Sequence, residues 1–126
     1  MSAALAMHPL SELPMSFPEK KNDPALYQWA LGRVLAHGRE TESDYTQQQM
    51  ADMLGITQRG YANVEHGVTP TLALYLNSAE LLDRDILAVF GLARVLVRLV
   101  QTEELSSGPL DKKQRDAIAN EFFKNM

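Results

Sequence analysis

The sequence has no cysteine, so neither a disulfide framework nor a thiolate metal site is possible. It also has no run of about 18 consecutive apolar residues, the length that a membrane-spanning helix needs. Its first residues do not carry the positive charge that opens a secretory signal. From these absences we expect a cytoplasmic protein with no membrane partner.

Residues that would support catalysis or metal binding are also sparse. The three histidines, His8, His37 and His66, do not have the spacing of metal ligands, and the acidic residues are scattered. There is no Ser-His or Cys-His arrangement and no glycine-rich phosphate loop. We therefore expect no enzyme activity, no metal site and no cofactor.

Positive charge is the third scarcity. The formal net charge is −4, and between Pro24 and Asp83 the basic residues are Arg33, Arg39 and Arg59. Lysine and arginine supply most of the non-specific affinity of proteins for nucleic acid. A chain with this charge balance would have to read DNA through base edges, helix dipoles and dimerisation.

The most informative stretch runs from Thr46 to Gly67. Thr46 and Gln49 have the spacing of a capping box, which starts a helix. An apolar stripe follows at Met50, Ala51, Met53 and Leu54. Gly55 is expected to end this helix, because glycine adopts the left-handed conformation without steric cost.

A second short helix is predicted directly after this turn. Thr57 is its expected N-cap, Tyr61 and Val64 its inward residues, and Gly67 its end. Two helices joined this closely must cross steeply, so the residue at the crossing must be small, and Ala51 has that place. This is the physical pattern of a helix-turn-helix.

The stretch resembles the Cro/phage-repressor (XRE-type) helix-turn-helix family. The resemblance rests on Thr46-Gln47, Met50-Ala51, Leu54-Gly55-Ile56-Thr57, Val64-Glu65 and Gly67, which have the family spacing without a gap. It implies an all-α fold, a five-helix lambda-repressor-like DNA-binding domain, here with an elongated fifth helix and an additional C-terminal helix.

In such a domain the second helix of the motif lies in the major groove of double-stranded DNA. Glutamine and asparagine side chains can pair with adenine, and arginine with guanine. The resemblance implies that Gln47 contacts a phosphate or buttresses a base contact. Tyr61 departs from the family, which usually has isoleucine or valine there, and we expect it to pack inward with its hydroxyl reaching out to a phosphate. The expected DNA-binding residues are Gln47, Thr57, Gln58, Arg59, Tyr61, Asn63 and Thr69.

Helices are predicted on both sides of the motif. Asp23-Pro24 starts one that ends at Gly38, and its Arg33 is either the partner of Glu65 or solvated. The acidic segment 39–45 is either a protruding loop or one more helical turn. A helix from residue 70 or 71 to 82 is expected to bury Leu72, Tyr75, Leu76, Ala79 and Leu82, and a last helix starts near Pro109.

The helix predicted from Arg84 to about Gln101, with Asp83 as its cap, is apolar most of the way round. A small domain covers only one face of such a helix, so the other face would be an unusual exposed patch for a monomer. This favours a two-fold homodimer, although the C-terminal helix is an alternative cover. The expected dimerisation residues are Ile86, Val89, Phe90, Val97 and Val100.

We therefore divide the chain into a flexible N-terminal arm (1–22), a helix-turn-helix domain (23–83) and a helical dimerisation region (84–126). Leu10, Leu13, Met15 and Phe17 offer a docking segment as the alternative reading of the arm. The leading hypothesis is a dimeric transcriptional regulator, most simply a repressor, on an inverted-repeat operator. The alternative is an antitoxin-like protein-interaction module that binds a protein partner through the acidic segment or the termini.

Overall fold

The computed structural model describes residues 23–68 and 71–126, and within them the chain forms six helices and no strand. They are α1 (Pro24–Glu42), α2 (Gln47–Leu54), α3 (Gln58–His66), α4 (Leu72–Leu81), α5 (Ile86–Ser107) and α6 (Lys112–Lys124). The predicted all-α fold is confirmed. The expected N-terminal arm and Thr69 lie outside the described residues.

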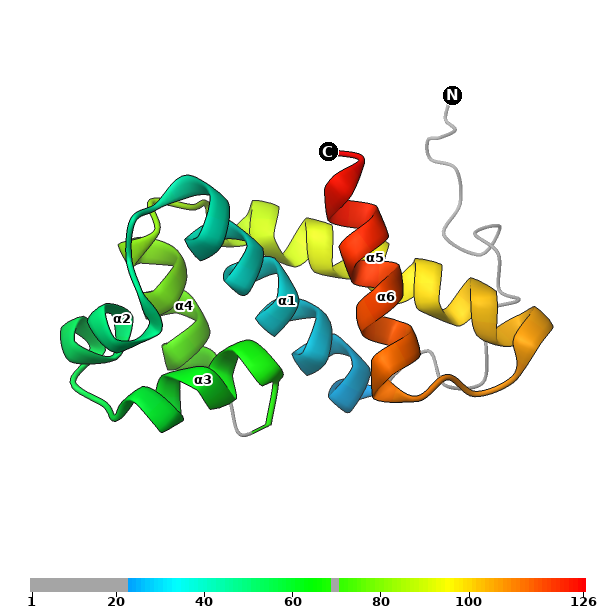
Figure 1. The fold of residues 1–126 in the computed structure, drawn as a ribbon, viewed down its shortest axis with the longest axis horizontal. Coiled ribbons are helices and arrows are strands. Elements are labelled where there is room, and N and C mark those ends of the chain that lie inside the picture. Colours follow the sequence, from blue (N-terminus) through cyan, green and yellow to red (C-terminus); the bar gives the residue numbers. More distant parts are fainter. Residues whose placement is uncertain (1–22, 69–70) are drawn as a thin grey trace, which may run out of the picture.

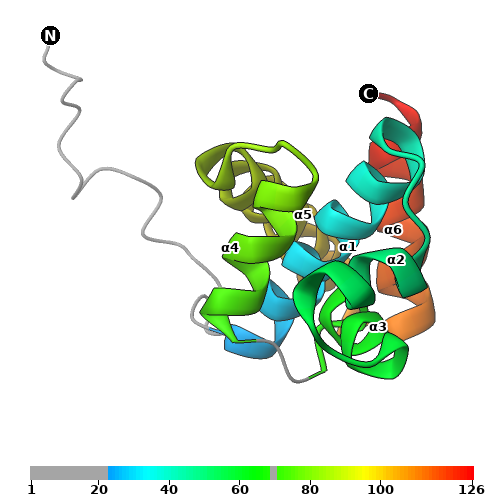
Figure 2. The same cartoon turned by 90° about the vertical axis from the view of Figure 1, so that its left-hand side faces the viewer.

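The helices α1 and α5 pack along each other and form the centre of the molecule (Figure 1). The pair α2 and α3 lies at one end with α4 beside it, and α6 crosses α1 and α5 on the other side (Figures 1 and 2). One hydrophobic cluster joins Trp29 and Leu35 of α1, Met50 of α2, Tyr61 of α3 and Leu96 of α5. The packing therefore shows no boundary between residues 83 and 84.

The predicted starts of α1, α2 and α3 are confirmed by their caps. The Asp23 carboxylate accepts from two backbone amides of the first turn of α1, and Pro24 stands at a position where no amide is required. Thr46 and Gln49 form the reciprocal capping box of α2. The Thr57 hydroxyl accepts from the Gly60 amide at 2.9 Å.

Two helices are longer or shifted relative to the sequence prediction. The helix α1 continues through Gly38 to Glu42, so the segment after Gly38 adds a helical turn. The helix α5 begins at Ile86 with Asp85 as its cap and continues past Gln101 to Ser107. Asp83 is not the cap, because it has φ 54° and belongs to the turn that ends α4.

The predicted buried face of α4 is only partly right. Tyr75, Ala79 and Leu82 are buried, but Leu72 is 61% exposed and Leu76 is 39% exposed. Apolar residues occur on every side of this short helix, so periodicity alone did not select its inward face.

Within the described parts of the chain, no helix combines the length and the apolar character needed to cross a lipid bilayer.

Candidate nucleic-acid interface

The turn between α2 and α3 has the predicted geometry. Gly55 adopts φ 71°, and the Ile56 amide donates to the Ala51 carbonyl at 3.0 Å. Ala51 is fully buried, as expected for the small residue at a steep helix crossing. The tight turn before α3 and the caps at its two ends thus fix the direction of this helix.

The helix α3 also touches the backbone of α1, through two glycines. A Cβ atom at Gly32 would overlap with the carbonyl group of Glu65. A Cβ atom at Gly67 would lie 2.7 Å from the Gln28 carbonyl, and Gly67 has φ 68°. Sequence reasoning missed Gly32, although a glycine inside a helix is unfavourable and signals a close approach.

A buried ionic network connects α3 to α1 and α2. Glu65 is 2% exposed, and its carboxylate accepts from Arg39 Nε at 2.6 Å and Arg39 Nη2 at 3.2 Å. Gln47 Nε2 donates to the same carboxylate at 2.9 Å. The bidentate pair joins the end of α1 to α3, and Gln47 adds the start of α2.

Of the two alternatives for Arg33, contact with Glu65 is the one observed, but it is made through the Glu65 backbone. Arg33 Nη2 donates to the backbone carbonyl of Glu65 at 2.9 Å, not to its carboxylate. The carboxylate belongs to Arg39, which the sequence analysis had placed in an acidic connecting segment. The extra helical turn of α1 places Arg39 beside the end of α3. Sequence spacing does not predict the direction in which this turn points.

Burial by itself would raise the pKa of Glu65, but hydrogen bonds from Arg39 and Gln47, together with the charge of Arg39, hold this pKa below its usual value. The hydrogen bond to Glu65 in turn raises the pKa of Arg39. Both groups are thus ionised at neutral pH, and the network stays intact.

On its outer side α3 presents the polar residues expected to read DNA. Gln58 and Arg59 are exposed, and Asn63 is half-buried on the next turn. Because α3 starts at Gln58, a later start of the helix does not account for Gly60. A Cβ atom there would lie 3.2 Å from the Thr57 hydroxyl, so glycine fits this first turn.

Three predicted contacts change in the structure. Tyr61 is completely buried, so its predicted contact with a phosphate was wrong. Burial, and to a lesser extent the nearby Glu65 charge, raises the pKa of its hydroxyl. The Gln47 amide donates to the buried Glu65 carboxylate, a contact that neither predicted role of Gln47 included. Thr57 is exposed, but its hydroxyl already caps α3.

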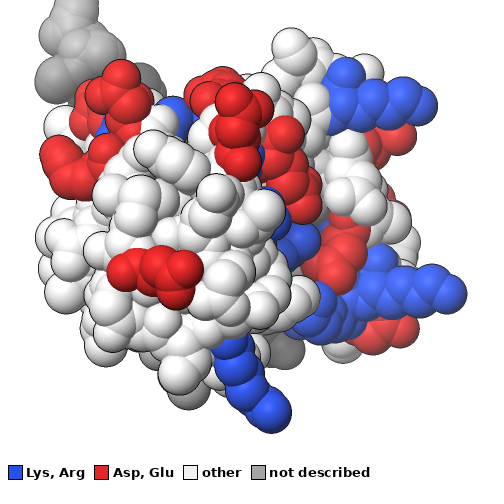
Figure 3. All heavy atoms as spheres, turned by 60° about the vertical axis from the view of Figure 1, so that its left-hand side comes forward, with Lys and Arg blue, Asp and Glu red and all other residues white. Residues whose placement is uncertain are grey.

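The end of the molecule that carries α2, α3 and α4 has little positive charge. Figure 3 shows a broad, mostly uncharged surface with one acidic group within it, further acidic groups above it and a basic side chain at its lower edge. Arg33 and Arg39 are turned inward to Glu65. Among the described residues between Pro24 and Asp83, Arg59 is the one exposed basic side chain.

The predicted dimerisation residues were mostly wrong. Val89, Val97 and Val100 are buried in the core, where α5 packs on α1, and Ile86 is partly buried. Phe90 is 36% exposed. The apolar residues that α5 turns outward are instead Leu87, Val95 and Leu99, at 74%, 46% and 41% exposure.

Residues 35–87 match the model of a family described as helix-turn-helix. The match spans the end of α1, the whole of α2 to α4 and the first residues of α5. No curated protein and no solved structure gives a significant match.

Proposed function

We propose that this chain is a sequence-specific transcriptional repressor, because residues 35–87 match the model of a helix-turn-helix family and the motif resembles the Cro/phage-repressor (XRE) type. It acts as a homodimer on an inverted-repeat operator. The two half-sites lie about one helical turn apart, roughly 34–36 Å, since each subunit places α3 in the major groove.

The observation that carries this proposal is the outer side of α3. Arg59 and Asn63, four positions apart, share that side, and Gln58 is exposed at the first position of the helix. The opposite side is held by the pair of Glu65 with Arg39 at 2.6 Å. A rigidly supported helix with adenine-reading and guanine-reading side chains suits direct readout of base edges.

Arg59 is the residue to test first. Replacing Arg59 with Ala should weaken operator binding by about 1–3 kcal/mol and relax the preference at one base position, because a bidentate contact to guanine is lost. The measurement is selection of DNA from a random pool, followed by titration of the selected operator with both proteins.

Gln48→Ala is a matched control on α2, because Gln48 is exposed and its amide is bound to Asp52. This change should leave the base preference as it is. If Arg59→Ala binds the operator with unchanged affinity and preference, α3 does not read the bases through Arg59.

Dimerisation is supported by the outward face of α5. Leu87, Gly91, Val95 and Leu99 follow one another at intervals of four residues along this helix, and a Cβ atom at Gly91 would meet no other atom within 4 Å. Exposed apolar side chains around a small residue suit the close approach of a second helix.

The acidic surface supports a second candidate, the binding of a basic protein partner. Figure 3 shows several acidic groups close together on one part of the surface. Glu42 at the end of α1 forms an ion pair of 2.7 Å with Arg84 after α4. A stoichiometric basic protein that co-purifies with the chain, together with no DNA selected from a random pool, would favour this candidate.

A further inference from the structure

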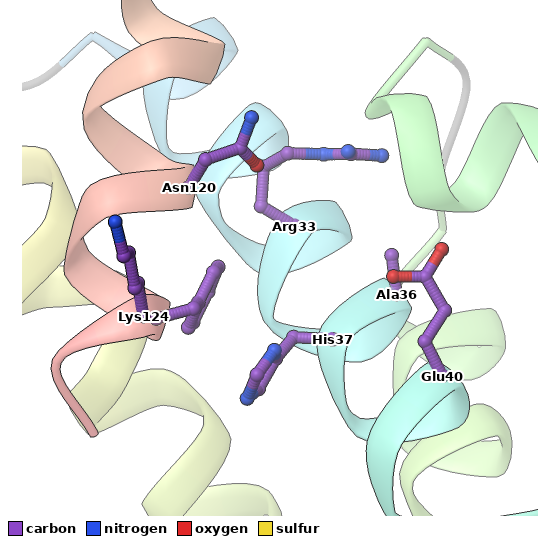
Figure 4. A pocket seen from close by; sticks show the side chains of 7 residues that line it. Arg33, Ala36, His37, Glu40, Asn120 and Lys124 are labelled. Carbon is purple, nitrogen blue, oxygen red and sulfur yellow. The ribbon is translucent and has the colours of Figure 1, made fainter.

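A groove lies between α1 and α6 (Figure 4). Its volume is about 260 Å³, which suits an ion or a small metabolite more than a drug-sized molecule. Arg33, His37 and Glu40 line it from α1, and Asn120, Phe123 and Lys124 line it from α6. The helix α6 lies outside the matched residues 35–87.

Specific contacts fix the two walls of this groove. Trp29 Nε1 of α1 donates to the Asp116 carboxylate of α6 at 2.8 Å, and the Arg115 guanidinium lies 5.6 Å from the centre of the Trp29 ring. The His37 and Phe123 rings stack at 4.3 Å with an interplanar angle of 8°. The groove is therefore a built feature of the α1–α6 packing.

Hydrogen-bond donors outnumber acceptors along these walls. Arg33 is held in place by its bond to the Glu65 carbonyl, while its Nε atom is buried without a hydrogen-bond partner. No carboxylate of the described residues forms an ion pair with Arg33. The Asp116 carboxylate, whose pKa the Arg33 charge helps to lower, is already bound by Trp29 and Lys112.

Two further side chains from α6 add to this donor set. Asn120 and Lys124 stand one helical turn apart, and Figure 4 shows Lys124 across the groove from Glu40. The Glu40 carboxylate is 3.5 Å from Arg39, so part of its negative charge is offset. The groove is thus lined by two cations, an amide, an imidazole and one carboxylate whose charge is partly neutralised.

We propose that this groove is a binding site for a small molecule with a phosphate or carboxylate group. The anionic group binds Asn120 and Lys124 of α6, because a charge-assisted hydrogen bond from an ammonium group is among the strongest available to an oxyanion, and the Arg33 side chain adds positive charge nearby. The stacked rings of His37 and Phe123 form the apolar floor.

The position of Arg33 connects this site to α3. One of its nitrogen atoms holds the carbonyl of Glu65 near the end of that helix, while the groove lies on its other side. An anion bound beside Arg33 therefore lies next to a side chain that contacts the helix proposed to read DNA. Binding of the anion itself does not depend on the proposed function and is tested without DNA.

The test is titration of the full chain with inorganic phosphate and, separately, with succinate, at an ionic strength held constant with sodium chloride. Backbone and side-chain NMR shifts of residues in α1 and α6 are followed to about 10 mM, where a site of millimolar affinity saturates. We expect saturable shifts at His37 and Asn120 with at least one probe, and the probe that binds identifies the anionic group.

Lys124→Met should weaken this binding by about tenfold or more, because it removes one cation from the groove. Lys113→Met is the matched control, since Lys113 is an exposed lysine of the same helix that does not line the groove. The proposal is overturned if neither probe gives saturable shifts, or if Lys124→Met and Lys113→Met bind the probe equally well.

Discussion

At the scale of single residues, Glu65 decides the position of the candidate recognition helix. Its carboxylate is buried, and a carboxylate is tolerated there only with a close cation and full hydrogen bonding. Arg39 supplies two bonds and Gln47 a third. The same side chain thus connects three helices and leaves the outer side of α3 free for a ligand.

Removing Arg39 should therefore be severe for stability. We expect Arg39→Ala to lower the free energy of unfolding by about 3–5 kcal/mol, because it leaves Glu65 charged and buried without its cation. Replacing both residues, as Arg39→Met with Glu65→Leu, should recover part of this loss. Urea unfolding followed by circular dichroism measures both changes.

The control for this prediction is Arg59→Ala, which removes an exposed arginine and should change stability by about 0.5 kcal/mol or less. Equal losses for Arg39→Ala and Arg59→Ala would mean that the buried pair does not hold the fold.

The depressed pKa of Glu65 gives stability a dependence on pH. Its usual value is 4.5, and the folded value lies below this, so the unfolded chain takes up the proton first as the pH falls. The stabilisation is therefore complete above pH 4.5 and is lost as the pH falls through the folded pKa. Glu65→Gln should flatten this part of the unfolding free energy profile.

Asp116 contributes in the same direction, because its pKa is also lowered, despite burial, by its bonds to Trp29 and Lys112. Asp116→Asn separates the two contributions. A Glu65→Gln profile as steep as that of the unmodified chain would show that Glu65 does not take part in acid unfolding.

At the scale of helices, the crossing of α1 and α3 depends on backbone contact. Gly32 and Gly67 let these helices approach until a Cβ atom at either position would collide with the other helix. Such contact leaves α3 little freedom to rotate or slide. The short helix α3 is thus oriented by α1 and by its own caps together.

Two glycines of similar conformation provide a direct test. Gly55 has φ 71° with open space around a Cβ atom, whereas Gly67 has φ 68° with the Gln28 carbonyl at 2.7 Å. Gly55→Ala should cost about 1–2 kcal/mol from the left-handed conformation alone. Gly67→Ala should cost clearly more, because the backbone of α1 must also move.

Both free energies of unfolding are measured by urea denaturation. A Gly67→Ala variant no less stable than Gly55→Ala would contradict the close packing of α1 on α3.

At the scale of the whole molecule, α5 serves two purposes. Its inner side, with Val89, Val97 and Val100, packs in the core of the domain. Its outer side keeps Leu87 and Val95 exposed. We propose that the second side pairs two chains, which doubles the few base contacts that one domain offers.

A charge on this outer side should separate the chains. Val95→Glu is expected to give a monomer and a large loss of operator affinity, because a glutamate would be buried against the partner helix without a cation. Leu72→Glu is the control, since Leu72 is an exposed leucine (61%) of α4 and not of α5.

The measurement is molar mass in solution by sedimentation or light scattering. An unmodified chain that remains monomeric at concentrations of tens of micromolar, or a Val95→Glu variant that remains dimeric, would rule out this interface.

The sequence by itself determined the elements and the motif. Thr46, Gly55, Thr57 and Gly67 carry local conformational preferences, so the ends of α2 and α3 and the turn between them could be predicted. The same local pattern predicted the helix-turn-helix that a family model matches over residues 35–87. It also predicted the polar residues on α3, because helical periodicity separates outward from inward positions.

Only the tertiary structure decided which partners and faces meet. The pairing of Arg39 with Glu65, the burial of the Tyr61 hydroxyl and the outward side of α5 depend on contacts between distant segments. A helix that is apolar on all sides, as α5 nearly is, has no periodic signal to mark its inner face. The neighbouring helix α1 makes that choice, and the register of α1 follows from the packing at Gly32.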